Sequence, residues 1–466
     1  MHAETAYLFR HALLRDAAYQ LQLPGDRARL HALAFEIIES LHGGRAPAAP
    51  PIDDLDGLPA PHGTDSVAAE LAQHAGLAAE PDFARWLALR DHYLRRRAAL
   101  CERAQGREAV EAWQGLGQSL EGQERAAAMA RAGYAQWRVG ALKEAEAMLT
   151  SAQACPECVT SPRVRMLCLL GLVNVLKDSG QASRAEETCN QALAMARSMK
   201  DAARECGLLA TLAMIYRQTG RVELAEQTMQ RGLALARQGG MADNEGTLLG
   251  NLAILHGETG RLEEAVAEMR RVLELARKAG DRRMQCIAWG NLANFMRARE
   301  QPEEAQAASL KALAIARELG DRRNEAIALR NLGSICAECR QFDDAENYCL
   351  RALAILRDIG DRRGEGIALT TASLVYLHTR QPQRALDTVE QALVIHRGTG
   401  NRRFEGSALC HEALVRVALG QFDAAREKWR LGSNLLVTVG DSVFLDRVTS
   451  QMRESCREAD IAPLDD

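Results

Sequence analysis

Glycines recur every 40 residues along most of this chain, each at the same point of a repeating helical pattern. An acidic or amide residue follows most of them directly. The recurring glycines are Gly240, Gly280, Gly320, Gly360, Gly400 and Gly440. A fixed period of this size is typical of stacked repeat proteins, because one short helical unit cannot bury its own apolar face. The sequence therefore predicts a solenoid whose function depends on a long binding surface.

The composition indicates an all-α protein. Aromatic residues make up only 4% of the chain, while hydrophobic residues reach 47%, a mixture that suits close-packed helices better than sheets. The 58 basic residues do not exceed the 62 acidic ones, so we expect no nucleic-acid partner. No stretch approaches the roughly 18 apolar residues of a membrane span. No signal peptide is visible, and 12 scattered cysteines favour reduced thiols, so we expect a cytoplasmic protein.

Composition and periodicity divide the chain into several zones. The Pro-rich stretch from Gly43 to Thr64 holds five of the 12 prolines, and we expect it to be an exposed linker or a disordered insertion. Two helices, Thr5 to Leu21 and Gly25 to His42, are expected before it. The predicted zones are a helical segment at 1–42, the linker at 43–64, degenerate helical repeats at 65–121, eight repeats at 122–440, and a capping helix and tail at 441–466.

The repeat unit is clearest at residues 321–360. Asp321 is a plausible N-cap of a first helix, and Gly360 closes the second helix. Small residues stand where the two helices must approach closely, namely Gly333 in the first helix and Ala345 and Ala352 in the second. This pattern resembles the tetratricopeptide repeat, which implies a right-handed superhelix of helix-turn-helix units.

The 40-residue period and the Gly-Asp-Arg-Arg and Asn-Leu-Gly sequences resemble the repeats of the Leu-Gly-Asn and kinesin light chain type. Such relatives bind peptides or proteins in the groove formed by their first helices. Residues Phe9 to Glu39 and Ala69 to His74 resemble the segment that follows the nucleotide-binding domain in bacterial STAND-type signalling ATPases. The chain contains no Gly-Lys pair and thus no phosphate-binding P-loop. This resemblance implies a sensor half without its ATPase.

Polar residues recur in register on the first helices. Asn251, Asn291 and Asn331 occupy one position in three successive repeats. We expect them to bind a partner's backbone, because an amide offers both a donor and an acceptor. The nearby residues expected at the same site are Asn294, Arg297 and Arg330. The alternative is that the asparagines cap or cross-link neighbouring helices.

Two further patterns have simpler interpretations. Arginine pairs recur at Arg282-Arg283, Arg322-Arg323, Arg362-Arg363 and Arg402-Arg403, where a solvated row of charges is the default and an anionic partner the alternative. Cys155-Pro-Glu-Cys158 has a metal-ligand spacing, but no second pair follows to complete four ligands. Cys336, Cys339 and Cys349 are explained by packing. We expect no metal and no cofactor.

No nucleophile, paired-carboxylate or metal-protease motif is visible, so we expect no catalytic residues and no enzyme. The leading hypothesis is a protein- or peptide-binding scaffold or sensor in bacterial signal transduction, with an ATPase, kinase or cyclase as possible signalling partner. The alternative is a regulatory fragment of a STAND-type transcription or cyclase regulator that binds a small inducer.

Overall fold

The computed structural model describes residues 23–54, 57, 59–78, 82–104, 107–156 and 160–465. The helix expected at Thr5 to Leu21 lies outside these residues. The regular elements within them are all helices. The chain divides into two compact units, Met1–Val175 and Leu176–Asp466, whose internal structures are described separately. This division differs from the zones expected from the sequence, whose boundaries remain a prediction.

The first unit is built from antiparallel helices around an aromatic core. Phe35 is fully buried, and its ring meets those of Trp86 and Tyr93 edge-on at centroid distances of 5.4 and 5.7 Å. No helix of the described residues is both long and apolar enough to cross a membrane. The helices are α2 (Pro24–Leu41), η1 (Gly63–Val67), α3 (Ala68–Leu77), α4 (Phe83–Ala104), α5 (Arg107–Ser119), α6 (Gly122–Arg138), α7 (Leu142–Ala154) and α9 (Pro162–Asp178), which runs across the unit boundary.

The Pro-rich stretch is not an exposed linker in its described part, because two arginines hold it against the helices. The Arg96 side chain is fully buried and donates to the Pro47 carbonyl at 2.8 Å and to Asp65 at 2.7 Å. Arg131 donates to the Ile52 carbonyl at 2.6 Å. A segment without its own secondary structure needs donors for its carbonyl groups, and these arginines provide them. They lie far along the chain, so the local composition could not predict the contact.

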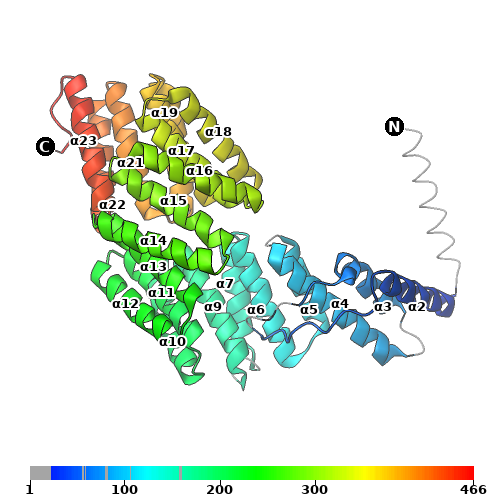
Figure 1. Ribbon diagram of the computed structural model, residues 1–466. Helices are drawn as coiled ribbons and strands as arrows, with labels where there is room; N and C mark the ends of the chain where they lie inside the picture. Colours follow the sequence, from blue (N-terminus) through cyan, green and yellow to red (C-terminus); the bar gives the residue numbers. More distant parts are fainter. Residues whose placement is uncertain are drawn as a thin grey trace, which may run out of the picture. The chain divides into compact units, whose positions relative to one another are not determined.

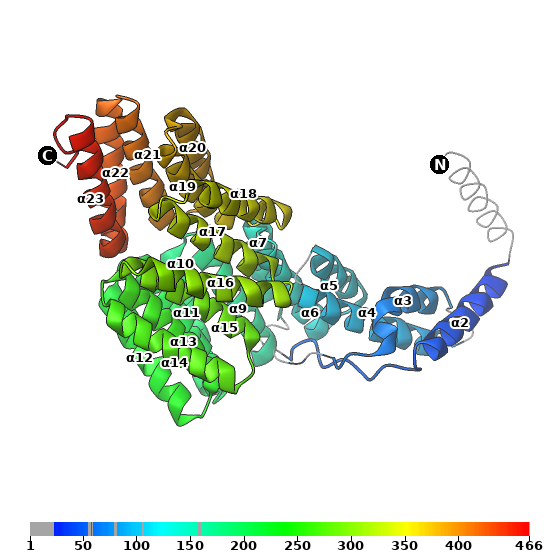
Figure 2. The ribbon, with the colours of Figure 1, turned by 45° about the horizontal axis from the view of Figure 1, so that its top comes forward.

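The second unit is a row of antiparallel helix pairs that follow one another in chain order (Figures 1 and 2). Most of its helices are 17 residues long, and each pair fills one 40-residue period. The helices are α10 (Ala182–Ser198), α11 (Ala202–Gln218), α12 (Val222–Gln238), α13 (Ala242–Glu258), α14 (Leu262–Lys278), α15 (Arg282–Ala298), α16 (Pro302–Glu318), α17 (Arg322–Glu338), α18 (Phe342–Asp358), α19 (Arg362–His378), α20 (Pro382–Gly398), α21 (Arg402–Ala418), α22 (Phe422–Val439) and α23 (Ser442–Glu458).

The predicted helix caps and close packing positions are confirmed in the repeat at residues 321–360. The carboxylate of Asp321 accepts the backbone N–H of Asn324 at 3.1 Å, and Gly360 ends the second helix with φ of +69°. A Cβ added at Gly333 would lie 2.7 Å from the Cys349 sulfur, so only glycine allows this approach of α17 and α18. Ala345 is fully buried at the same contact. The register therefore encodes helix ends and helix packing.

The helix pairs of the second unit curve so far that its last helices return to its early ones. Helix α23 packs against α13. The turn that ends α22 approaches the turn that ends α11, since a Cβ added at Gly220 would lie 2.5 Å from the Thr438 carbonyl oxygen. The unit therefore closes on itself, and the closure encloses the space inside the curve.

Candidate ligand-binding cavity

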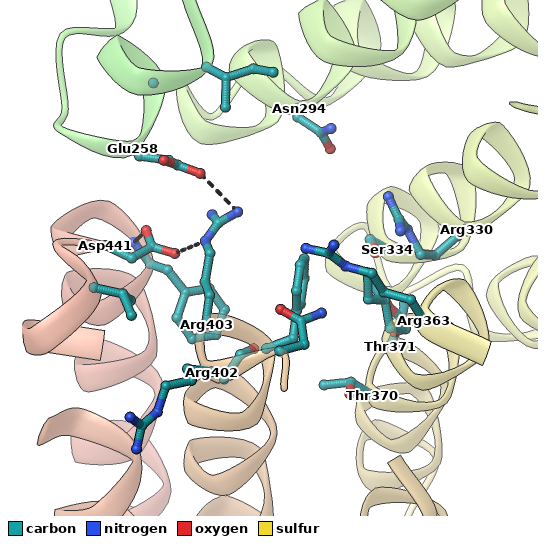
Figure 3. A pocket seen from close by; sticks show the side chains of 18 of the residues that line it. Glu258, Asn294, Arg330, Ser334, Arg363, Thr370, Thr371, Arg402, Arg403 and Asp441 are labelled. Atoms are coloured by element: carbon teal, nitrogen blue, oxygen red, sulfur yellow. Dashed lines mark hydrogen bonds and ion pairs between the residues drawn. The ribbon is translucent and has the colours of Figure 1, made fainter. Parts of the chain in front are cut away.

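The closed curve of the second unit encloses a cavity of about 840 Å³. Its wall is formed mainly by the first helix of each pair, from α11 to α21, together with α23. The volume falls within the roughly 300–1,000 Å³ of ordinary ligand pockets. Figure 3 shows polar and charged side chains from several of these helices extending into this space. A short ligand could therefore be surrounded by several repeats at once.

Five of the six residues predicted for the binding site line this cavity, and one does not. Asn291, Asn294 and Arg297 come from α15, while Arg330 and Asn331 come from α17. Asn251 occupies the same position of its repeat in α13 but is not among the lining residues. Whether the five bind a ligand remains a prediction, but the fold brings them to one surface.

The three in-register asparagines have different environments. Asn331 is only 4% exposed, and its amide donates to the Gly290 carbonyl of α15 at 3.3 Å and accepts from Arg330 at 3.1 Å. It therefore links two neighbouring first helices, which was the structural alternative for this position. Asn291 and Asn294 make no side-chain hydrogen bond within the described part of the chain, so their amides remain available to a ligand.

The cavity wall carries an excess of positive charge. Eight of its lining residues are Lys or Arg and four are Asp or Glu, whereas the whole chain has a net charge of −4. Arg297 pairs with Glu338 at 2.7 Å. Among the described residues, Arg330, Arg363 and Arg402 form no ion pair. Figure 3 shows Arg330 and Arg363 extending into the same space, with Arg402 directed away from them.

The pKa values of the unpaired arginines reflect this positive environment. Burial and, after it, the charge of the nearby Arg297 lower the pKa of Arg330 to about 10. The pKa of Arg363 is also lowered, first by burial, which together with the charges of Arg217 and Arg323 outweighs the opposing effect of Asp178. Both side chains still carry their charge at neutral pH. A negative group beside either guanidinium would offset the neighbouring positive charges.

Four charged residues form what we call the closure contact, namely Arg217, Glu258, Arg403 and Asp441. Glu258 at the end of α13 accepts from Arg217 at 2.6 Å and pairs with Arg403 of α21 at 3.0 Å. Arg403 also pairs with Asp441 at 2.7 Å, as Figure 3 shows. Burial alone would raise the pKa of Glu258, but Arg403 and Arg217 outweigh it and hold that pKa below its usual value. The sequence analysis missed Glu258, because nothing local links it to Arg403.

The arginine pairs of the sequence form a ladder between repeats. The second arginine of a pair reaches the helix-capping aspartate of the next repeat in three cases: Arg283 pairs with Asp321 at 3.5 Å, Arg323 with Asp361 at 2.9 Å, and Arg403 with Asp441 at 2.7 Å. For Arg363 the corresponding capping residue is Asn401. The ladder is therefore interrupted where Arg363 lines the cavity.

Two buried polar groups of the cavity wall also lack partners. Asn401 is 7% exposed, and its amide nitrogen makes no hydrogen bond. His411 is 5% exposed, and its Nδ1 likewise has no partner. Burial and the charge of Arg447 lower the pKa of His411 to about 3, so its ring is neutral at physiological pH. Unpartnered polar groups are costly when buried, and they are common where a ligand binds.

Of the three cysteines expected to pack, two do so, whereas Cys339 is exposed and the packing explanation is wrong for it. Cys336 and Cys349 are buried, and burial raises the pKa of their thiols to about 11 and about 12. Within the described residues, no group of three His, Cys, Asp or Glu side chains is arranged to hold a metal ion. Cys158, the second cysteine of the Cys155 motif, lies outside the described residues.

Comparison with known proteins places this structure among repeat proteins. A family model of the tetratricopeptide repeat matches residues 204–278, 284–358 and 326–397. Comparison with characterised protein sequences gives no significant match.

Three solved structures illustrate the likeness of the fold. A Rap protein complexed with competence and sporulation factor aligns over 76% of this chain and 99% of its own, with 14% identity and a TM-score of 0.57. NprR in complex with its cognate peptide NprX aligns over 77% and 100%, with 14% identity and a TM-score of 0.52. The apo form of the quorum sensor NprR from B. thuringiensis aligns over 73% and 95%, with 16% identity and a TM-score of 0.50. At such identities the likeness shows the fold alone. The chain thus contains tetratricopeptide repeats, which build the helix pairs of an all-α solenoid.

Proposed function

We propose that this protein is a non-catalytic sensor that binds a short peptide in the cavity of its second unit and passes the binding event to a signalling partner. The observation that carries the proposal is the cavity itself, which the first helices of successive repeats enclose and line with polar side chains. A pre-formed site costs little ordering when a ligand binds. Two of the similar structures are described as a Rap protein complexed with competence and sporulation factor and as NprR in complex with its cognate peptide NprX.

Asn291 and Asn294 are the residues that we propose form hydrogen bonds with the peptide backbone. Both line the cavity, and neither amide is used within the described structure. A peptide that lies along α15 would offer N–H and C=O groups to them, and each such hydrogen bond contributes about 0.5–1.5 kcal/mol. Asn331 would act indirectly, because its link to Gly290 fixes the spacing of α15 and α17.

The experiment identifies and then quantifies the ligand. Mass spectrometry of peptides that co-purify with the full chain from its native host would supply the ligand, whose affinity is then measured by calorimetry. Replacing Asn291 and Asn294 together by alanine should weaken binding about tenfold, from two lost hydrogen bonds. Asn251→Ala is the matched control, because it has the same register but does not line the cavity. Equal effects of both changes, or none, would contradict the proposed site.

A second candidate function rests on the size of the cavity and on the N-terminal sequence. A volume of about 840 Å³ also suits a small inducer, as expected for a regulatory fragment related to STAND-type ATPases. Co-purification of a small molecule in place of a peptide, together with a P-loop ATPase encoded next to this chain, would favour this candidate. An ATPase, kinase or cyclase as the signalling partner also belongs to the proposal.

A further inference from the structure

We infer that the cavity selects a ligand with a carboxylate, and that the interrupted arginine ladder at Arg363 and Asn401 is the site that binds it. This inference rests on the proposed peptide-binding function and specifies the chemistry of the peptide. The ligand is an acidic peptide, whose side-chain or C-terminal carboxylate lies between Arg363 and Arg330.

The first argument is the interruption of the ladder. At three steps, an aspartate both caps its own helix and pairs with the arginine of the preceding repeat. Asp361, for example, accepts the Gly364 N–H at 2.8 Å and pairs with Arg323 at 2.9 Å. At the fourth step Asn401 does neither, since it makes no side-chain cap bond and its amide nitrogen has no partner. Arg363 is thereby left without the carboxylate that its counterparts have.

The second argument is the position of this interruption. Arg363 and Asn401 both line the cavity, as do Arg403 and its aspartate Asp441, whereas Arg283 and Arg323 do not. Arg330 of α17 extends into the same space and also forms no ion pair within the described structure (Figure 3). Two guanidinium groups and one amide N–H₂ group thus offer donors to one negative group. Planar guanidinium forks bind carboxylates through paired hydrogen bonds.

The third argument is electrostatic. The lining residues carry twice as many basic as acidic side chains, in a chain that is slightly acidic overall. The four acidic lining residues are already engaged, because Glu258 and Asp441 belong to the closure contact, Glu338 pairs with Arg297, and Asp178 pairs with Lys177. A negative group on the ligand would complement the positive charge that these pairs leave unbalanced. A neutral or basic ligand would leave Arg330 beside the positive charge of Arg297, and Arg363 beside those of Arg217 and Arg323, without a further negative group.

The decisive variant restores the ladder. Asn401→Asp would introduce a carboxylate that caps α21 and captures Arg363, as happens at the other three steps. We expect its melting temperature to equal or exceed that of the wild type, while its affinity for acidic peptides falls at least tenfold. Arg363→Gln should lower that affinity similarly. Arg323→Gln is the matched control, because it removes a ladder arginine outside the cavity and should leave binding unchanged.

The probes are two pools of short synthetic peptides with a neutral fluorophore, identical except that Asp and Glu in one pool are Asn and Gln in the other. Fluorescence anisotropy with the full chain measures their binding, and thermal-shift assays with citrate and inorganic phosphate test free anions. Tighter binding of the acidic pool, lost in Asn401→Asp and Arg363→Gln and kept in Arg323→Gln, would support the inference.

The other outcomes separate the inference from the proposed function. Equal binding of both pools would overturn the carboxylate site and leave peptide binding intact. Stabilisation by citrate or phosphate that requires Arg363, without binding of either pool, would overturn the peptide as ligand while supporting an anion site. Unchanged acidic-pool binding in Asn401→Asp would refute the role of the interrupted ladder, even if peptides bind.

Discussion

Replacing Glu258 by glutamine should loosen the closure of the second unit without unfolding its repeats. Glu258 is 13% exposed and receives Arg217 at 2.6 Å and Arg403 at 3.0 Å, two contacts between elements far apart in sequence. Hydrogen bonds to charged groups contribute about 1.5–3 kcal/mol each. Glutamine at position 258 keeps one acceptor oxygen. Because the Arg403 side chain is 39% exposed, water compensates for part of the lost charge interaction. We therefore expect the closed form to lose about 1–2 kcal/mol, which lowers the ratio of closed to open molecules by a factor of about 5–30.

Hydrogen–deuterium exchange would measure this loosening. Exchange should rise in the turns at 218–222 and 437–441, which approach each other only in the closed form, and remain unchanged inside α17 and α18. Glu325→Gln is the matched control. Glu325 is 14% exposed and also has two arginine partners, Arg317 and Arg322, but both lie close to it along the chain. Equal exchange in the two variants, or faster exchange throughout the unit, would refute the closure role of Glu258.

The closure should also depend on pH with a defined sign. The pKa of Glu258 is lowered in the folded chain from its ordinary value of 4.5, because Arg403 and Arg217 outweigh the effect of burial. A carboxyl group whose pKa is lower in the closed form than in the open form stabilises the closed form at pH values above its ordinary pKa. This stabilisation is lost as the pH falls through the lowered pKa. Exchange at the two turns, measured relative to the intrinsic exchange rate at each pH, should therefore be slow at neutral pH and rise as the pH falls below 4.5. The rise should be absent in Glu258→Gln.

Two further predictions concern the repeats themselves. Glu300, in the turn after α15, has a φ of +58° at a position where several other repeats have glycine, as at Gly260, and two have arginine, Arg340 and Arg380. The strain of about 1–2 kcal/mol exceeds the entropy cost of glycine, so Glu300→Gly should stabilise the chain by about 0.5–1 kcal/mol in urea unfolding, and Gly260→Ala should destabilise it. Ala345→Leu should destabilise the chain by about 1–3 kcal/mol, because Ala345 is fully buried beside α17. Ala307→Leu, at an exposed helix position, should change stability by less than about 0.5 kcal/mol.

The repeat fold could be predicted from the sequence because its signals are local. Gly360 must adopt a positive φ, Asp321 must cap a helix, and Gly333 must allow a close helix contact, all within one 40-residue period. The same register placed five of the six predicted site residues on the cavity wall. The register could not separate Asn251 from Asn291, because their positions in the repeat are identical.

Other features depend on contacts across long stretches of chain. The Pro-rich segment packs because Arg96 and Arg131 bind its carbonyl groups, and neither arginine is a neighbour in sequence. The interruption at Asn401 was visible in the sequence as the amide in a series of aspartates. Only the fold shows that the aspartates at the equivalent positions pair with the second arginine of the preceding repeat.

The sequence by itself thus determined the helices, their ends and the stacking of the repeats, because these depend on residues within one turn or one period. The tertiary structure alone decided how strongly the stack curves, since small rotations between successive pairs accumulate along the row. That accumulated curvature brings Glu258 to Arg403 and encloses the cavity. It also brings Arg363, which has Asn401 where its counterparts have an aspartate, to the cavity wall.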